Sequence, residues 1–331
     1  MADTESGSGR GGSAARALLS TDDSDRVPIG GYGQVTTFRI QPHVRLQEWV
    51  AEDRGFFRDE GLDYEFEAVG FAGASSTTSP SVSPGDAAPV AARSGAFEDM
   101  EQGRTCSVSS ACHWAVNAAA SSSHGRMWGK AYSICDSAIF VAADSPYRRP
   151  EDLAGAKVGV GYHSGSHYSA IQALEPFLER SEIALQFVGL PFDRVRLMQR
   201  GEIEVANVFG AGYYLLEQQG FRKLVDTTFV MGFLVAEDAD AAQVDGYFRA
   251  LRHAQREIDL EPERFKHYWR REIPEDLAGD IDVRRFGPGE RIVFEPYTRD
   301  MFERTHRWME GWGLFDARGA ARLDYDTAVL V

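Results

Sequence analysis

The sequence predicts an α/β protein in which strands and helices alternate along most of a chain of 331 residues. Short apolar runs rich in Val, Ile and Phe are typical of buried strands, and segments with helical spacing follow most of them. A strand, a helix and a strand near the start of the chain imply a parallel pair joined by a crossover. Apolar residues make up 43% of the chain and charged residues 26%, the composition of an ordinary globular protein with a sizeable core.

The first parallel pair comes from the N-terminal part of the chain. Residues 34–40 (QVTTFRI) alternate as a strand does, and residues 62–69 (LDYEFEAV) form the second strand. Between them, residues 43–61 place large apolar side chains at helical spacing and end at a glycine, which predicts the crossover helix. The polar, proline-containing segment 70–87 that follows is either a surface insertion or a flap over a cleft.

The rest of the chain repeats this alternation before it becomes helical. Residues 87–103 predict a helix, and residues 104–120 predict a short strand that runs into another helix. Further strands are expected at residues 137–143, 157–161, 183–190, 203–209 and 233–236, with helices between them. After the last of these strands, the spacing predicts only helices, over residues 244–273 and 297–315.

The N-terminal sequence, the cysteines and the net charge indicate the compartment of the protein and the kinds of partner it could bind. Residues 1–30 carry few large apolar side chains, so we expect a disordered tail. The start has no apolar signal region and no lipid-acceptor Cys, and no later run reaches membrane-spanning length, which favours a cytoplasmic protein without membrane insertion. Cys106, Cys112 and Cys135 show no disulfide or zinc spacing and are expected to be buried thiols. A net charge of -15 argues against a nucleic-acid partner.

Several segments resemble one family in order and spacing. They are WVAEDRGFFRDEGLDYEFEAV, DSPYRRPEDLAGAKVGV, LMQRGEIEVANVFGAGYYLLEQQGFR and VDGYFRALRHAQREIDLEPERFKHYW. Over roughly residues 34–315 the chain resembles the substrate-binding proteins of nitrate, sulfonate and taurine uptake, together with their enzymatic relatives. Those relatives include thiamin pyrimidine synthases, dihydroxyphthalate decarboxylases and hydroxybiphenyl sulfinate desulfinases.

This resemblance implies a two-lobed clamshell of the type II periplasmic-binding-protein kind, in which each lobe is a sheet covered by helices. Lobe one is expected to contain residues 31–135 and 232–331, and lobe two residues 136–231. The ligand then lies in the cleft between the lobes. Independently of the family, ligands of open α/β sheets bind at the carboxyl ends of strands, so the segments that leave strands are the candidates for the site.

One such segment predicts an anion-binding site. In GYHSGSHYSA, Ser164, Gly165 and Ser166 lie where a helix should begin, and the free N–H groups and dipole of a helix start favour an acidic ligand group. Members of the resembling family seat an anionic group here. The alternative is an ordinary serine N-cap without a ligand.

Histidines near strand ends suggest chemistry beyond binding. His163 and His167 share a helix face if the helix begins by His163, and His113 follows another strand in ACHWAV. We hypothesise that these three converge on the cleft and either transfer protons or hold a divalent metal, the only cofactor that the sequence suggests. The alternative is that His167 packs or caps while His163 is solvated.

Other candidates follow the remaining strand ends. The resemblance places His43 near the position where the pyrimidine synthases carry a His and the desulfinases a Cys, which makes it a fourth catalytic candidate. Ser110, Asn207 and Tyr213 are expected to line the cleft and contact the ligand. The cysteine-rich signature of the pyrimidine synthases is absent, which argues against pyrimidine synthesis.

Two classes of function fit these observations. The first is a cytoplasmic enzyme that cleaves or decarboxylates a small, aromatic carboxylate or sulfinate; the histidines and the missing signal favour it. The second is a solute-binding protein of an ABC-type uptake system for a small organic anion, and a cytoplasmic ligand sensor is a further alternative. In each case the expected partner is a small anionic organic molecule.

Overall fold

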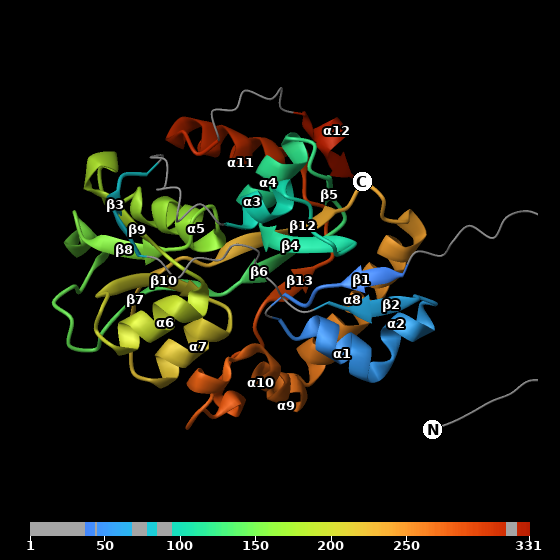
Figure 1. The fold of residues 1–331 in the computed structure, drawn as a ribbon, viewed down its shortest axis with the longest axis horizontal. Helices are drawn as coiled ribbons and strands as arrows, with labels where there is room; N and C mark the ends of the chain where they lie inside the picture. The colour runs from blue at the N-terminus through green and yellow to red at the C-terminus, as the bar shows by residue number, and fades with distance from the viewer. Residues whose placement is uncertain (1–36, 44, 68–77, 85–94, 316–322) are drawn as a thin grey trace, which may run out of the picture. The chain divides into compact units, whose positions relative to one another are not determined.

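The computed structural model describes residues 37–43, 45–67, 78–84, 95–315 and 323–331. Within them, strands form two separate sheets with helices packed around each, as Figure 1 shows. The expected disordered tail, residues 1–30, lies outside the described residues. No helix in the described part of the chain combines the length and the apolar character needed to span a membrane.

The first sheet has the strand order β13-β6-β12-β4-β1-β2, and β5 pairs with both β12 and β14. The predicted parallel pair is confirmed, because β1 pairs in parallel with β2 and also with β4. The bounds of these strands are β1 Phe38–Ile40, β2 Tyr64–Phe66, β4 Val108–Cys112, β5 Arg126–Trp128, β6 Tyr132–Cys135, β12 Phe229–Val235, β13 Arg291–Val293 and β14 Val329–Leu330.

The second sheet has the order β11-β7-β10-β8-β9-β3. Its centre is parallel, because β8 pairs in parallel with both β9 and β10. Its bounds are β3 Thr78–Val82, β7 Ser137–Val141, β8 Lys157–Val160, β9 Ala184–Val188, β10 Val205–Phe209 and β11 Arg222–Asp226.

Helices cover both sheets. On the first sheet, α1 and α2 pack against α8, while α4 packs against β12 and carries α11 on its other side. On the second sheet, α5, α6 and α7 all contact β10. The bounds are α1 Gln47–Arg54, α2 Phe56–Asp59, α3 Ala96–Glu101, α4 His113–Ser121, α5 Gly165–Leu174, α6 Pro191–Gln199, α7 Ala211–Gln218, α8 Ala241–Leu260, α9 Pro262–Phe265, α10 Trp269–Glu272, α11 Arg299–Trp312 and α12 Tyr325–Ala328, with short 3-10 turns between some of them.

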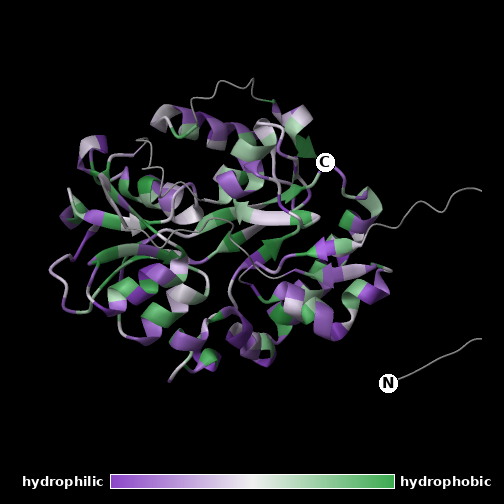
Figure 2. Cartoon of the chain, in the orientation of Figure 1, coloured by the Kyte–Doolittle hydropathy of each residue, from purple (hydrophilic) through white to green (hydrophobic). Residues whose placement is uncertain are grey.

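Hydrophobic residues are frequent in the central strands, and the surrounding helices contain both hydrophobic and hydrophilic residues, as Figure 2 shows. Two clusters of buried side chains form the core, and each contains residues from both sheets. Trp269 is fully buried in one cluster and Trp114 in the other. The hydrophobic interior therefore continues from one sheet to the other.

Two expectations about the elements are wrong. The segment 70–87 was expected to be a polar loop, either a surface insertion or a flap, but Thr78–Val82 within it forms β3, which pairs with β9 at the edge of the second sheet. The Ser79 hydroxyl accepts a hydrogen bond from the Phe187 amide at 2.9 Å, so the polar side chain is used inside the pairing. The C-terminal part is not purely helical either, because β13 and β14 add short strands to the first sheet.

Candidate functional site

A cavity of about 120 Å³ is lined by residues of both sheets and their connections. Its polar lining residues are His43, Asp99, Arg104, Ser110, Cys112, Tyr162, Ser164 and Arg194, and its larger apolar ones are Leu190, Phe192, Phe209, Phe229 and Met231. The wall is thus mainly apolar and aromatic with a few polar groups, the character of a site for a small organic ligand.

Arg194 is the main positive charge in this wall. It lies on α6, is 1% exposed, and donates from Nε to the Asn207 carbonyl at 3.0 Å and from Nη1 to the Gly189 carbonyl at 2.8 Å. Nη2 has no hydrogen-bond partner, and no described carboxylate forms an ion pair with this guanidinium. Burial lowers the pKa of Arg194 to about 9, so the group stays charged at neutral pH.

A buried charge without a counter-ion is energetically costly, and protein structures usually pair it. The carbonyl oxygens around Arg194 fix its position, but they do not neutralise it. The second arginine of the cavity differs in this respect, because Arg104 forms an ion pair with Asp99 at 2.6 Å. The cavity wall therefore contains one paired and one unpaired guanidinium.

The predicted anion site lies beside this charge. The turn after β8 ends at Ser164, the N-cap residue of α5, and both Ser164 and Gly165 line the cavity. A Cβ atom on Gly161 in the same turn would lie 3.2 Å from Nη1 of Arg194, which shows how closely the turn approaches the guanidinium. The start of α5 and Arg194 thus contribute positive character to the same part of the wall.

The hydroxyls of Ser164 and Ser166 form hydrogen bonds to the backbone of the turn. Ser164 Oγ donates to the Gly161 carbonyl at 2.8 Å, and Ser166 Oγ accepts from the Gly161 amide at 2.9 Å. Ser166 is fully buried and is not among the cavity-lining residues. Gly165 is required by packing, because a Cβ there would lie 2.3 Å from the Phe229 ring. Of the three predicted residues, Ser164 and Gly165 reach the cavity and Ser166 supports them.

Of the four candidate histidines, only His43 lines the cavity. It follows β1, and its Nδ1 lies 3.6 Å from Oε2 of Glu290, an ion-pair distance that is longer than a hydrogen bond. Ser110, also predicted, lines the cavity from β4, and its carbonyl accepts from Arg104 Nη1 at 3.2 Å. Both residues thus line the cavity, and their roles in catalysis and ligand contact stay predictions.

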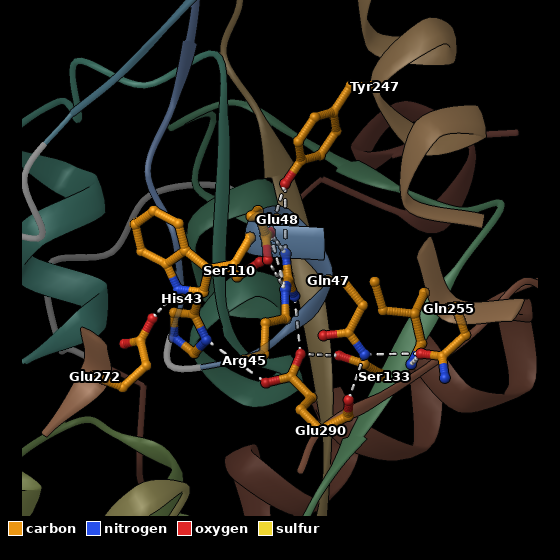
Figure 3. Close-up of polar contacts among 12 residues, drawn as sticks. His43, Arg45, Gln47, Glu48, Ser110, Ser133, Tyr247, Gln255, Glu272 and Glu290 are labelled. Carbon is orange, nitrogen blue, oxygen red and sulfur yellow. Dashed lines mark hydrogen bonds and ion pairs between the residues drawn. The ribbon is translucent and has the colours of Figure 1, made fainter. Parts of the chain in front are cut away.

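Behind His43 lies a buried charged cluster, shown in Figure 3. Arg45 is 1% exposed and forms ion pairs with Glu48 and, at 2.8 Å, with Glu290. Ser133 donates to Glu290 at 2.5 Å, and Tyr247 donates to Glu48 at 2.8 Å. Burial alone would raise the pKa of Glu290, but the Arg45 charge, His43 and the Ser133 hydroxyl hold it at about 2.

His113 does not belong to this cavity. It is the first residue of α4, and its Nδ1 lies 2.9 Å from the Tyr297 hydroxyl and 3.2 Å from Thr305 Oγ1. Its ring also packs on Trp114, with centroids 4.3 Å apart. Burial lowers the pKa of His113 to about 3, so at neutral pH it is an uncharged core residue.

His163 and His167 lie close to each other and are not among the cavity-lining residues, although Tyr162 and Ser164 on either side of His163 are. Their rings are stacked with centroids 6.0 Å apart, and His163 Nδ1 lies 2.6 Å from Glu98 Oε1. His167 is buried with neither ring nitrogen hydrogen-bonded, and burial lowers its pKa. His163 has a positive φ of 39°, uncommon outside glycine, where the turn reverses into α5.

The three histidines have different hydrogen-bond partners, and none of them is among the cavity-lining residues. His113 bonds Tyr297 and Thr305, whereas His163 bonds Glu98. Among the residues that the structure describes, no group of three or more His, Cys, Asp or Glu side chains is arranged to hold a metal ion. The described residues therefore do not fit the suggested divalent metal.

Asn207 and Tyr213 do not reach the cavity lining either. Asn207 is fully buried, and its amide donates to the Ser166 carbonyl and to Ser169, while its oxygen accepts from Ser137 and Thr227. It therefore ties the start of α5 to the second sheet. Tyr213 is half-buried, and its hydroxyl accepts from Lys223 at 2.8 Å. Asn207 lies within β10 and Tyr213 in α7 after it, and position near a strand end could not distinguish these contacts from contact with a ligand.

All three cysteines are free and buried, as expected. Cys112 lines the cavity, so its chemistry bears on the site. Burial raises the pKa of this thiol to about 12, well above the ordinary value of 9.0. The thiol is the protonated and weakly nucleophilic form at neutral pH.

We expect Cys112 to react slowly with iodoacetamide in the folded protein. At pH 8 its thiolate fraction should be about a thousandfold below that of an unperturbed thiol, since the pKa rises from 9.0 to about 12. Mass spectrometry of the alkylated peptides over time, with urea-unfolded protein as the reference, measures this rate. Alkylation of Cys112 as fast as in the unfolded chain would instead indicate an activated thiolate.

The structure adds three charged residues that the sequence did not single out: Arg45, Arg194 and Glu290. A signal for Arg194 does exist, because Arg194, Val195 and Met198 form the buried face of α6. A charged residue on the buried face of a helix is a candidate for function. Glu290 follows the Gly-Pro-Gly sequence before β13, a strand that the helical spacing of this region did not predict.

Comparison with known proteins identifies the fold. No protein-family model matches the sequence, and no curated protein matches it either. The alkanesulfonate-binding protein SsuA from Xanthomonas axonopodis pv. citri, solved bound to MOPS, matches with a TM-score of 0.63 at 13% identity, over 88% of this chain and 97% of that chain. The desulfurization enzyme DSZB in complex with biphenyl-2-sulfinic acid matches with a TM-score of 0.54 at 12% identity, over 86% and 93% of the two chains.

A third matching structure is described by the name of its fold. The Candida albicans CA3427 gene product, described as having the generic periplasmic binding protein structural fold, matches with a TM-score of 0.60 at 11% identity, over 89% of this chain and 96% of that chain. The chain therefore has the two-lobed periplasmic-binding-protein fold that the sequence predicted. This fold is shared by binding proteins and by at least one enzyme, so function has to be argued from the site.

Proposed function

We propose that the protein binds a small organic anion with an aromatic or otherwise apolar body in this cavity. The observation that carries the proposal is the buried, unpaired guanidinium of Arg194 in a wall made mainly of aromatic and aliphatic side chains. A carboxylate, sulfinate or sulfonate group would neutralise this charge, and Phe192, Phe209 and Phe229 would cover the apolar body. The SsuA and DSZB structures, solved with a sulfonate buffer and a sulfinic acid, agree with this ligand class.

Replacing Arg194 with glutamine should weaken the binding of an aromatic anion at least tenfold. A charge-assisted hydrogen bond contributes about 1.5–3 kcal/mol, and 1.4 kcal/mol corresponds to a factor of ten in affinity. Isothermal titration calorimetry with benzoate, benzenesulfinate and benzenesulfonate at pH 7 measures the effect. Arg196→Gln is the matched control, because Arg196 lies on the same helix but pairs with Asp276 at the surface.

The control variant should keep its affinity within about twofold of the wild type, since it removes a positive charge outside the cavity lining. Circular dichroism confirms that both variants are folded. Equal affinity of Arg194→Gln and wild type for these anions, or wild-type protein that binds none of them at millimolar concentration, would contradict the proposal.

We further propose that the protein is a cytoplasmic enzyme that decarboxylates or cleaves this anion. His43 favours the enzyme over a carrier or a sensor, because binding alone does not require an imidazole backed by a buried carboxylate. Incubation with aromatic carboxylates and sulfinates, followed by detection of the arene and of released CO2 or sulfite, tests this step. Tight binding without turnover would favour a solute-binding protein or a sensor.

A further inference from the structure

We infer that Glu290, held by Arg45, is a positioning residue that orients His43 as the proton donor for the anion in the cavity. This inference rests on the proposed function and names the atom that would act there. His43 presents Nδ1 to Glu290 and also lines the cavity. With Nδ1 facing the carboxylate, Nε2 is the ring nitrogen left to exchange a proton with a bound molecule.

The neighbours of the Glu290 carboxylate stabilise its ionised form in the protein interior. Arg45 Nη1 contacts Glu290 Oε1 at 2.8 Å and Ser133 donates to the same oxygen at 2.5 Å, which leaves Oε2 toward His43. The backbone carbonyl of Glu290 also accepts from Gln47 at 2.6 Å, so the residue is fixed at both ends. Such a rigid acceptor selects the tautomer of a neighbouring imidazole, because only an Nδ1–H can face a carboxylate without repulsion.

The distance of 3.6 Å is longer than a hydrogen bond, but catalytic contacts in ligand-free enzymes are often long and shorten when the ligand binds. The charges around the ring agree with this orientation. Glu48 and Glu290 share the single positive charge of Arg45, so His43 Nδ1 faces a cluster with excess negative charge. An N–H group suits this position better than a nitrogen lone pair, which leaves Nε2 to exchange a proton with the ligand.

The step that this arrangement serves is the replacement of an acidic group by hydrogen on an aromatic ring. The carbon that carries the carboxylate or sulfinate takes a proton from His43 Nε2, and its bond to the acidic group breaks. The electron pair of that bond stays on the ring carbon, and CO2 or SO2 leaves. His43 then regains a proton from water, so the reaction needs no oxidant or reductant.

Nitrogen-15 NMR of histidine-labelled full-length protein tests the inference without a known substrate. Between pH 6 and 8, the wild-type protein should show a His43 signal with a protonated Nδ1, and assignment follows from its loss in His43→Gln. Glu290→Gln should remove this preference and shift the neutral ring toward the Nε2–H tautomer. A neutral His43 that carries its proton on Nε2 in the wild type would overturn the inference, whatever the variants do.

The matched control is Glu272→Gln. Glu272 is a half-buried carboxylate that is also drawn in Figure 3, but it accepts a hydrogen bond from Trp49 Nε1 at 2.5 Å, and among the described residues the ion-pair partner of His43 is Glu290. This variant should leave the His43 tautomer unchanged, and an equal shift in both variants would contradict a specific role for Glu290. Calorimetry with benzoate on the same samples separates the two proposals. If the wild-type protein binds benzoate but its His43 carries the proton on Nε2, only the role of Glu290 is refuted. If the wild-type protein does not bind benzoate, the anion site itself is refuted.

Discussion

Replacing Arg45 with methionine is expected to lower the free energy of unfolding by about 3–5 kcal/mol, the usual cost of removing one partner from a buried ion pair. Arg45 is 1% exposed and is the shared partner of Glu48 and Glu290. Without it, two carboxylates remain in the core, with the Tyr247 hydroxyl donating to Glu48, the Ser133 hydroxyl donating to Glu290, and His43 Nδ1 3.6 Å from Glu290. Either they stay charged without a counter-ion or they take up protons at neutral pH, and both outcomes cost free energy.

Urea denaturation at pH 7, followed by tryptophan fluorescence, measures this loss. Arg39→Met is the control, because Arg39 forms an exposed pair with Glu67 at 3.6 Å, and such pairs contribute at most about 1 kcal/mol. The triple variant Arg45→Met, Glu48→Gln and Glu290→Gln should recover part of the stability, since it removes the unpaired charges as well. A loss below 1 kcal/mol for Arg45→Met would show that the cluster is not held by its charges.

The fold was largely predictable because its signals are local. The strand that ends at Val160 and the helix that follows it show their periods within a few residues, and the structure has β8 and α5 there. The strands that were missed, such as β13 and β14, have three and two residues. A segment that short shows no clear period, and its strand geometry comes from pairing with distant residues.

The site was less predictable because it depends on which side chains reach one cavity. His43 and His113 both stand near strand ends, yet the first lines the cavity and the second turns to Tyr297 and Thr305. The carboxylate that lies 3.6 Å from His43 Nδ1 belongs to Glu290, 247 positions further along the chain. Spacing within a motif carries no information about a contact of that separation, so the sequence could suggest His43 but could not supply its partner.

Buried polar residues explain the remaining errors. Asn207 follows the pattern of a ligand-binding amide at the end of a strand, but its oxygen and nitrogen are fully used by Ser137, Thr227, Ser166 and Ser169. Arg194 shows the opposite pattern, because it lies at a buried helix position and keeps one nitrogen without a partner. What separates a structural polar group from a functional one is whether its hydrogen bonds are satisfied, and only the structure shows that.

As the pH falls from 4.5 to 2, the loss of the ionised form of Glu290 should lower the free energy of unfolding by about 3 kcal/mol. Its pKa in the folded protein is about 2, below the ordinary value of 4.5, so the folded state favours the ionised carboxylate. The stabilisation is therefore complete above pH 4.5 and is lost as the pH falls toward 2, at about 1.4 kcal/mol for each pH unit. Glu290→Gln removes this contribution while it leaves the other carboxylates in place.

The measurement is the free energy of unfolding in urea at intervals between pH 2 and 7 for the wild type and Glu290→Gln. The variant should be less stable by about 3 kcal/mol at pH 7, and the two curves should approach each other as the pH falls toward 2, where Glu290 begins to take up a proton in the folded wild type as well. Glu272 should show the opposite dependence on pH. Burial raises its pKa to about 7, so the folded state favours its protonated form, and this contribution to stability is lost as the pH rises toward 7. If the curves for wild type and Glu290→Gln are parallel, Glu290 has the same pKa in the folded and the unfolded state. That result would mean that the buried ion pair with Arg45 is not formed in solution.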